Sequence, residues 1–484
     1  LVFLNGDHKG FDLIIGNPPF LGGSKISTEL GDPFLKYLKG SFSHSEKNTD
    51  LSAYFFRRGF DLIRNSDGYI GLIATNTIGQ GDTRVTGLFQ LIEEGGKITY
   101  TDRYVKWGGD ATVEVNLITL RKYGRIANKA LLDGRVVTQI SSFLDDLPEY
   151  TPKRLFTNQL KAFIGDHISG IGFVIPNEEA DVLCRTEPKN IDCIYPFLTG
   201  NDLNKSPFQE PSRRVICFHD WPLDKASEYP DLLRIVKERV KPYRDKAKRD
   251  GHRRKWWLFG DYRKGLREAI KPLSRILVRA QVSDTHSLAF IPQGYVCADK
   301  VIVFAFDSYF SFGVLQSNVH EIWLRRYTST MRTDVSYAPS DCFLTFPFPQ
   351  HPSENGMSFV DSTSIAFYDF RHLCMESRQL GLTKLYNLFN NPDIQDLDIT
   401  KMRNLQIHMD QSVLTCYGWE DIDLQHDFYS NDRKKIRFMP SPAAQREIFT
   451  RLVALNQEIA AQEAAQGLVV EAGEEDESDE ETEA

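Results

Sequence analysis

Four consecutive residues near the start of the chain, Asn17, Pro18, Pro19 and Phe20, combine groups suited to holding an amino group. The Asn17 amide and the Pro18 carbonyl offer two acceptors, and the prolines stiffen the loop because proline fixes φ and restrains its predecessor. Two acceptors on the hydrogens of a purine amino group favour the pyramidal geometry in which its lone pair attacks a methyl donor. Phe20 can stack on the base, which must first leave the duplex. A rigid turn after a core strand is the alternative interpretation.

The pattern around this loop alternates strands and helices. The expected strands are residues 11–16, 69–75, 97–105 and 113–120, and the expected helices are residues 50–64 and about 88–94. The first two strands are apolar runs typical of strands buried on both faces, and Thr49 or Asp50 can cap the first helix. This order predicts a mostly parallel α/β sheet, in which functional groups collect beyond the carboxyl ends of the strands.

The character of the sequence changes three times along the chain. We expect an α/β domain over residues 1–149, an α+β domain over 150–350, a helical domain over 351–466 and a disordered acidic tail over 467–484. Proline, aromatic and basic residues become frequent in the second part, and apolar residues at helical spacing dominate the third. The tail has almost nothing to bury.

Charge is distributed unevenly along the chain. The net charge of −8 includes nine acids and no base in residues 471–484, so that elsewhere 58 basic residues face 57 acidic ones. Residues 234–279 hold seventeen Lys or Arg against five Asp or Glu. Local blocks of this kind, rather than the total, decide where a polyanion binds.

The densest part of this basic block predicts contact with nucleic-acid phosphates, since Lys and Arg at this density suit phosphate contact. A solvated helical face is the alternative for such a run. Trp256 and Trp257 follow it directly, and we expect them to pack in a core rather than to stack on bases. The candidate DNA-binding residues are Lys241, Arg244, Lys248, Arg249, Arg253, Arg254 and Lys255.

Several other classes of site are not expected. The seven cysteines form no C-x-x-C pair and no cluster with histidines, so the sequence predicts neither a metal site nor a disulfide framework. Neither a P-loop nor a serine-nucleophile motif occurs. No apolar run approaches the roughly 20 residues that span a bilayer, and the first residues lack the features of a signal peptide. We therefore expect a soluble, cytoplasmic protein.

The residues DLIIGNPPF, 12–20, resemble the catalytic motif of DNA methyltransferases that act on amino groups. The wider sequence is similar to the MmeI-like methyltransferases of single-chain restriction-modification systems, near relatives of the PglX phage-defence methylases. This resemblance spans about residues 11–463. The segments that carry it are residues 68–84, 107–120, 194–204, 380–392 and 409–419.

The resemblance implies a fold and an activity. The fold is a partial Rossmann-like sheet of the S-adenosylmethionine-dependent methyltransferases, followed by an α+β target-recognition domain that binds duplex DNA and a helical C-terminal domain. The activity is transfer of a methyl group from S-adenosylmethionine to the exocyclic amino group of adenine at specific DNA sites. Asn17 and the Pro18 carbonyl would hold that amino group, Pro19 would shape the loop, and Phe20 would stack on the flipped base.

Residues near the cofactor are implied less strongly. Asp50, Leu51 and Tyr54 open the helix that runs near S-adenosylmethionine in this superfamily, but capping and packing explain them equally well. Four polar residues follow the second expected strand, where substrate loops belong, and an ordinary polar loop is the favoured interpretation for Asn76, Gln80, Asp82 and Arg84.

In this family the glycine-rich cofactor loop and the acidic residue that binds the ribose precede the catalytic motif. Only sixteen residues precede Asn17, so we expect a fragment or one part of a split enzyme, without the family's nuclease domain and with little activity alone. Two other functions stay open, a non-catalytic DNA-binding subunit and a methyltransferase that acts on protein glutamine or RNA. The large basic region favours duplex DNA over the latter.

Overall fold

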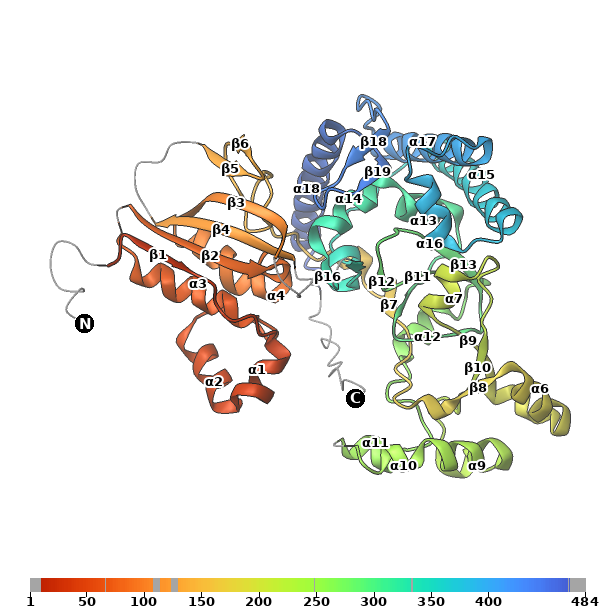
Figure 1. Cartoon of the computed structure of the whole chain (residues 1–484). Helices are drawn as coiled ribbons and strands as arrows, with labels where there is room; N and C mark the ends of the chain where they lie inside the picture. The colour runs from red at the N-terminus through yellow and green to blue at the C-terminus, as the bar shows by residue number, and fades with distance from the viewer. Residues whose placement is uncertain are drawn as a thin grey trace. The chain divides into compact units, whose positions relative to one another are not determined.

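A computed structural model describes residues 10–65, 67–107, 114–122, 129–247, 249–331, 334–468 and 470 (Figure 1). The chain divides into two compact units, each built from three separate segments. The first unit contains Leu1–Thr151, Arg325–Ser336 and Asp427–Arg437. The second unit contains Pro152–Leu324, Tyr337–His426 and Phe438–Ala484.

The first unit is organised around a six-stranded sheet with the order β1-β2-β4-β3-β5-β6. Its strands are β1 (Leu13–Gly16), β2 (Gly68–Thr75), β3 (Gly96–Lys106), β4 (Glu114–Lys122), β5 (Ala130–Leu132) and β6 (Arg135–Val137). The four expected strands are therefore confirmed. The prediction of a mostly parallel sheet is wrong, because β4 pairs antiparallel with both β2 and β3, and only β1 with β2 and β3 with β5 run parallel. β3 ends at Lys106 and β4 begins at Glu114, a separation in sequence that suits antiparallel neighbours, whereas parallel neighbours need a longer crossover.

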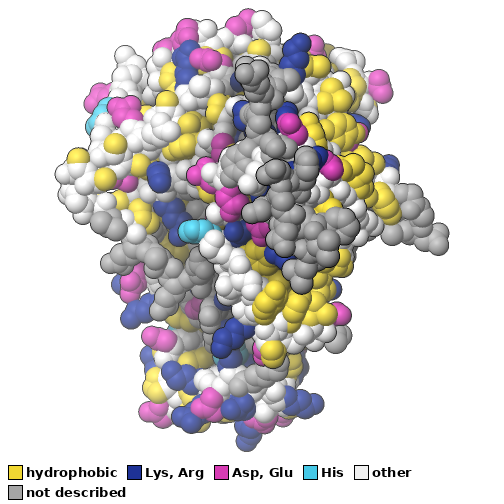
Figure 2. Space-filling model, turned by 90° about the vertical axis from the view of Figure 1, so that its left-hand side faces the viewer, with side chains coloured by type: hydrophobic (Ala, Val, Ile, Leu, Met, Phe, Trp, Pro, Cys, Tyr) yellow, Lys and Arg dark blue, Asp and Glu magenta, His cyan; other side chains and the backbone are white. Residues whose placement is uncertain are grey.

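The strand β1 lies at the edge of this sheet, and the prediction that it is buried on both faces is wrong. Phe11, Leu13 and Ile15 are 45%, 53% and 75% exposed, respectively. Side chains two residues apart point to the same face of a strand, so these three share one exposed face. Ile14 points the other way and packs against the core of the unit. Figure 2, viewed from the side on which β1 lies in Figure 1, shows hydrophobic side chains at the surface.

Helices cover the other face of the sheet, where Ile70, Leu72, Ile118 and Leu120 are buried. Asp50 caps α3, which confirms the expected helix and its cap. The helical stretch expected near residue 88 begins earlier and includes one π-helical turn. The helices of this part are α1 (Gly23–Leu30), α2 (Asp32–Ser41), α3 (Leu51–Leu62), the 3-10 turn η2 (Asn76–Gly79), α4 (Gly81–Arg84), the π-helical turn η3 (Val85–Phe89) and α5 (Gln90–Glu93).

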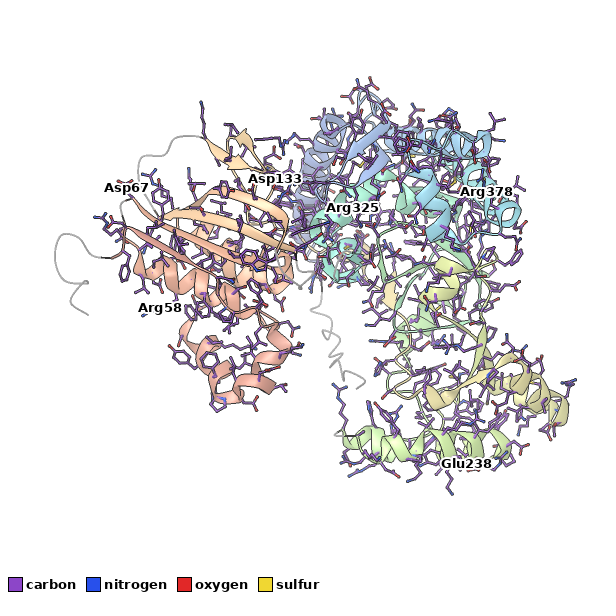
Figure 3. All side chains as sticks on the ribbon, viewed as in Figure 1. Arg58, Asp67, Asp133, Glu238, Arg325 and Arg378 are labelled. Atoms are coloured by element: carbon purple, nitrogen blue, oxygen red, sulfur yellow. The ribbon has the colours of Figure 1, made fainter. Side chains whose placement is uncertain are left out.

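Side-chain contacts join the three segments of the first unit. The Gln80 amide oxygen accepts hydrogen bonds from the backbone N–H and the hydroxyl of Thr330, both at 3.0 Å. The buried Arg103 guanidinium pairs with Asp133, labelled in Figure 3, at 2.8 Å and with Asp432 at 3.0 Å. Each later segment is thus fixed to the N-terminal segment of the unit by at least one polar contact.

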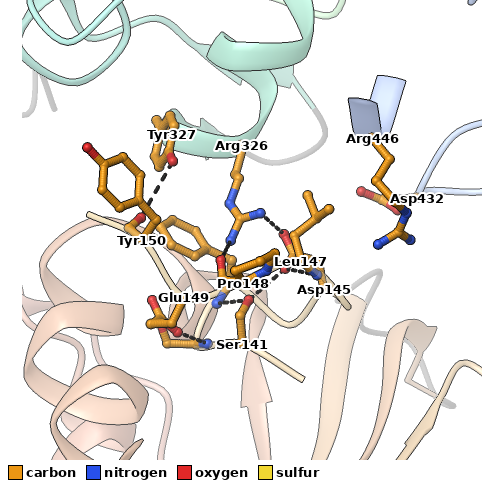
Figure 4. A network of polar contacts seen from close by, with 12 residues as sticks. Ser141, Asp145, Leu147, Pro148, Glu149, Tyr150, Arg326, Tyr327, Asp432 and Arg446 are labelled. Atoms are coloured by element: carbon orange, nitrogen blue, oxygen red, sulfur yellow. Dashed lines mark hydrogen bonds and ion pairs between the residues drawn. The ribbon is translucent and has the colours of Figure 1, made fainter. Parts of the chain in front are cut away.

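The linker before residue 151 is part of the same polar network (Figure 4). Arg326 pairs with the Asp145 carboxylate at 3.1 Å and donates a hydrogen bond to the Pro148 carbonyl at 2.8 Å. The Tyr327 hydroxyl lies 3.5 Å from the Tyr150 carbonyl oxygen. Arg326 and Tyr327 therefore hold residues 145–150, the segment from which the chain passes into the second unit.

The second unit contains two four-stranded sheets, with orders β14-β9-β10-β8 and β13-β11-β15-β7. Both have mostly antiparallel pairings, as in an α+β fold, and their neighbouring cores centre on Phe173, Ile216 and Val278. The strands of the two sheets are β7 (Ala162–Ile164), β8 (Val174–Pro176), β9 (Ile194–Leu198), β10 (Arg213–Ile216), β11 (Arg275–Ala280), β13 (Ala289–Pro292), β14 (Val296–Cys297) and β15 (Val301–Phe304). Of the remaining strands, β12 (Val282–Ser283) belongs to the second unit, and β16 (Ser329–Met331), β17 (Asp334–Ser336) and β18 (Asp427–Ser430) belong to the first. The strand β19 (Ile436–Met439) begins in the first unit and ends in the second.

Helices dominate the later part of the second unit. Long helices pack around buried residues such as Phe367, Met409 and Leu452. These helices are α15 (Glu354–Arg378), α16 (Leu382–Phe389), α17 (Leu397–Tyr417) and α18 (Pro442–Ala465). No described helix is both long and apolar enough to cross a membrane.

The first part of the second unit carries shorter helices. They are α6 (Asn177–Thr186), α7 (Gly200–Lys205), α8 (Leu223–Ala226), α9 (Pro230–Arg239), α10 (Lys241–Arg244), α11 (Asp250–Arg254), α12 (Lys264–Ile270), α13 (Tyr309–Gln316) and α14 (Asn318–Tyr327), the last of which ends in the first unit.

Candidate active site and candidate DNA interface

The four candidate catalytic residues form a loop directly after β1, which we call the NPPF loop (Asn17–Phe20). Because β1 and β2 run parallel, the loop lies at the same edge of the sheet as the end of β2. Asn17 and Phe20 are exposed, with the Phe20 ring 39% accessible, whereas Pro18 is buried. An amide and an aromatic ring are thus presented to solvent by a loop anchored through a proline.

The start of α3 holds the chain just after the NPPF loop. The Leu51 N–H donates a hydrogen bond to the Leu21 carbonyl at 2.9 Å. Gly23 comes very close to the segment that precedes α3. A Cβ added at Gly23 would lie 2.3 Å from the Asn48 carbonyl carbon and 2.6 Å from the Thr49 nitrogen. Only glycine permits this approach of two backbones. Nothing in the sequence pattern pointed to Gly23, because a backbone contact leaves no periodic signal.

Asp50, Leu51 and Tyr54, the candidate cofactor residues, are 6%, 6% and 3% exposed. The Asp50 carboxylate accepts hydrogen bonds from the Ser52 N–H at 2.9 Å and the Ser52 hydroxyl at 2.7 Å, as an N-cap does. Leu51 and Tyr54 pack in a small cluster with Ile26. The described contacts of these residues are those of capping and packing.

Burial also changes the acidity of this cluster. It raises the pKa of Asp50, since the ionised carboxylate loses hydration, although hydrogen bonds from Ser52 and Leu21 oppose the shift. Burial likewise raises the pKa of Tyr54. The neighbouring Ser45 and Thr49 side chains oppose this shift of the Tyr54 pKa.

The polar residues after β2 contact the protein around them. Asn76 begins the 3-10 turn that follows the strand. Asp82 accepts a hydrogen bond from the Asn48 N–H at 2.8 Å, and the buried Arg84 donates to the Ser142 hydroxyl at 2.7 Å. These contacts agree with the interpretation as a polar loop.

The candidate DNA-binding residues lie on α10, α11 and the turns beside them, which follow α9 in a row in Figure 1. Lys241 pairs with Asp245 at 2.7 Å. Arg253 and Arg254 both pair with Asp250, at 3.1 and 2.7 Å, but their side chains stay 41% and 79% exposed. Ion pairs between exposed groups are weak, so these arginines can exchange their partner for a phosphate.

The other candidates of this region differ in their surroundings. Arg249 and Lys255 are exposed, and Lys255 forms no ion pair with any residue in the described ranges. Lys248 lies outside the described residues. Trp256 and Trp257 pack against the hydrophobic core of the second unit, as expected, and the Trp257 indole N–H donates to the Trp221 carbonyl at 2.9 Å.

Arg244 is the exception in this set, and its location contradicts the predicted phosphate contact. The residue is 0% exposed, and its guanidinium donates hydrogen bonds to the carbonyls of Ile168 at 3.1 Å and Leu258 at 3.0 Å. A side chain surrounded in this way cannot reach a phosphate. The error has a plain cause, because a charge run in the sequence does not distinguish the inward from the outward face of a short helix.

Comparisons with known proteins match two parts of the chain, the one that carries the NPPF loop and the one that carries the basic residues. The Eco57I restriction-modification methylase family matches residues 2–94, and the MmeI target recognition domain family matches residues 158–350. DNA methyltransferase A of Bacillus subtilis (strain 168) is 22% identical over 396 residues, which cover 77% of this chain and 42% of that protein.

A solved structure shows the same fold. The type IIL restriction-modification enzyme MmeI, solved in complex with DNA, superposes with a TM-score of 0.71 and 17% sequence identity, covering 93% of this chain and 57% of that one. The chain thus spans about half the length of these relatives. Taken together, the matches make residues 2–94 similar to the Eco57I restriction-modification methylases and residues 158–350 similar to the MmeI target recognition domain.

Proposed function

We propose that this chain is the catalytic and target-recognition part of a site-specific DNA adenine methyltransferase in a restriction-modification or phage-defence system. It transfers a methyl group to the exocyclic amino group of adenine in duplex DNA. The domain division at about residues 149, 350 and 466 is part of this proposal. The carrying observation is the NPPF loop, which presents Asn17 and Phe20 at the edge of the sheet where β1 and β2 end.

The NPPF loop supplies the groups that the reaction requires of the protein. The Asn17 amide oxygen and the Pro18 carbonyl accept the two hydrogens of the adenine amino group and orient its lone pair. Pro19 keeps the loop stiff, so that little order is lost when the base enters. The Phe20 ring stacks on the flipped base, a contact that every base can make through its π face.

S-adenosylmethionine is the methyl donor of methyltransferases of this kind, and we propose that it is the donor here. We propose that Asp50, Leu51 and Tyr54 open the helix that runs on the cofactor side of the site. Their capping and packing also fix the backbone at Leu21, next to the NPPF loop.

The second unit supplies the binding of duplex DNA in this proposal. Lys241 and the exposed Arg249, Arg253, Arg254 and Lys255 contact phosphates and set the position of the duplex without reading its sequence. The similarity of residues 158–350 to a target recognition domain supports this role.

The test compares Asn17→Ala with wild type in the longest natural form of the protein that contains this chain. We expect Asn17→Ala to lose most methyl transfer to adenine while its affinity for duplex DNA stays within about twofold. The control is Asn404→Ala, which changes an exposed asparagine on α17 and should leave both properties unchanged. Equal turnover of Asn17→Ala and wild type would refute the assignment.

A non-catalytic DNA-recognition subunit is the second candidate. The burial of Asp50, Leu51 and Tyr54 favours it, because no candidate cofactor residue is accessible. Calorimetric titration with S-adenosylmethionine separates the two. Binding and adenine methylation support the enzyme, whereas DNA binding without either supports the recognition subunit.

A further inference from the structure

One short helical turn, α4, contacts the segment that leads into α3. The Thr83 hydroxyl accepts a hydrogen bond from the Asp50 N–H at 3.0 Å, and Asp82 accepts one from the Asn48 N–H at 2.8 Å. One turn later, the Thr86 hydroxyl lies 2.7 Å from that of Thr49. Three consecutive residues before α3 are therefore held by side chains of α4 and the turn that follows it.

This segment is in turn connected to the NPPF loop. The Leu51 N–H bonds the Leu21 carbonyl, and the Gly23 backbone packs directly on residues 48 and 49. Any shift of the Asp50 backbone therefore moves the chain immediately after Phe20. A loop that holds a reacting group tolerates little displacement, since an error of about 1 Å can lower a rate roughly 100-fold.

The other side of the same turn contacts two segments through which the chain passes to the second unit. Gln80, one residue before α4, accepts both hydrogen bonds from Thr330 in the segment Arg325–Ser336. Arg84 donates to Ser142, and its guanidinium lies 3.9 Å from the centre of the Phe143 ring.

Phe143 joins these contacts. The guanidinium of Arg326 lies 4.6 Å from the same ring, so the ring packs against two arginines from distant parts of the sequence. Such contacts contribute more when they are shielded from water, and Arg84 is only 6% exposed. Gln80 and Arg84 are four residues apart, joined by the bond from the Arg84 N–H to the Gln80 carbonyl, and therefore lie on one face of the turn.

We propose that α4 is a coupling element. On one side, Gln80 and Arg84 contact the two segments through which the chain passes to the second unit. On the other side, Asp82 and Thr83 position the NPPF loop through the residues before α3. None of these is a catalytic residue; all four are positioning residues. Through these contacts, a displacement of the segments around Phe143 and Thr330 on DNA binding reaches the backbone at Asp50 and Leu21. The expected effect on catalysis rests on the proposed function, whereas the coupling of the segments on the two sides of α4 does not depend on it.

The test uses substitutions that keep shape and remove one polar group. Thr83→Val loses the acceptor for Asp50, whereas Thr83→Ser keeps it. Gln80→Met loses the acceptor for Thr330, whereas Gln80→Glu keeps it. The matched control is Thr77→Val, an exposed threonine in the preceding 3-10 turn η2, whose hydroxyl contacts only Thr75 among the described residues.

We expect Thr83→Val and Gln80→Met to lower turnover of methylation by roughly 10- to 100-fold while the Kd for duplex DNA changes by less than about twofold. Thr83→Ser, Gln80→Glu and Thr77→Val should stay near wild type. A purely structural role would lower affinity and turnover together and would not be rescued by the conservative variants.

Hydrogen exchange gives a second measurement that does not need activity. Gln80→Met should speed exchange of residues 46–51 as well as of the segment Arg325–Ser336 that it contacts. Faster exchange in Arg325–Ser336 alone would overturn the coupling. Were the wild type to methylate no DNA, the proposed function would fail, whereas the exchange result would still decide the proposal for α4.

Discussion

The buried Arg244 offers a quantitative test of which basic residues face DNA. Its two hydrogen bonds to carbonyls, at 3.1 and 3.0 Å, each contribute about 1.5–3 kcal/mol because the donor is charged. Arg244→Met keeps much of the packed aliphatic volume but removes both bonds, so we expect the free energy of unfolding to fall by about 3–6 kcal/mol. Lys255→Ala, at an exposed residue, should change it by less than about 0.5 kcal/mol.

DNA binding should change in Lys255→Ala and not in Arg244→Met, the reverse of the expected effects on stability. Fluorescence anisotropy with a labelled duplex at several salt concentrations gives the slope of log K against log salt. We expect Lys255→Ala to make that slope shallower by about one unit on cognate and unrelated duplexes alike, and Arg244→Met to leave it unchanged below its unfolding temperature. An Arg244→Met protein with wild-type stability and a shallower salt slope would refute the reasoning.

Two further predictions concern the chain around the NPPF loop. Gly23→Ala should destabilise the first unit by about 1–3 kcal/mol, because the new Cβ would lie 2.3 Å from the Asn48 carbonyl carbon, whereas Gly22→Ala, with nothing within 4 Å, should be neutral in urea denaturation. Asp50→Asn keeps an acceptor for Ser52 but removes the buried charge. Burial raises the pKa of the Asp50 carboxyl in the folded state, so the folded protein binds its proton more tightly than the unfolded chain does. The stability that the protonated carboxyl contributes is therefore present at low pH and lost as pH rises through the raised pKa. The Tm of Asp50→Asn should therefore exceed that of wild type at pH 7 and converge with it near pH 4; a difference independent of pH would contradict this.

Local patterns in the sequence were sufficient for the elements that position the site. The apolar runs predicted β1 and β2, and helical spacing with a capping acid predicted α3 and its cap at Asp50. Strand direction was not accessible in this way. A strand has the same alternation of side chains in a parallel and an antiparallel pair, so nothing in the residues of β4 revealed its reversed direction.

Contacts between distant segments were the other part that could not be predicted. Thr83 is an ordinary residue of a polar loop in the sequence, and only the fold places its hydroxyl against the Asp50 N–H. Arg244 belongs to a basic run, and only the fold turns it inward. In each case the role of the residue depends on which face of a short helical turn packs against another segment. Turns of four or five residues are too short to show a periodic pattern that would reveal this face.

The construction of the first unit from three chain segments has a consequence for its synthesis. The sheet and the NPPF loop are encoded before residue 151, but Arg325–Ser336 and Asp427–Arg437 supply contacts to Gln80 and Arg103. A ribosome must therefore translate nearly the whole chain before the unit can be completed, and the long loops that must close make this last step slow. Until then the nascent sheet lacks its later segments, and the NPPF loop forms on a partly assembled unit. The order of translation thus places completion of the first unit after synthesis of residues 158–350.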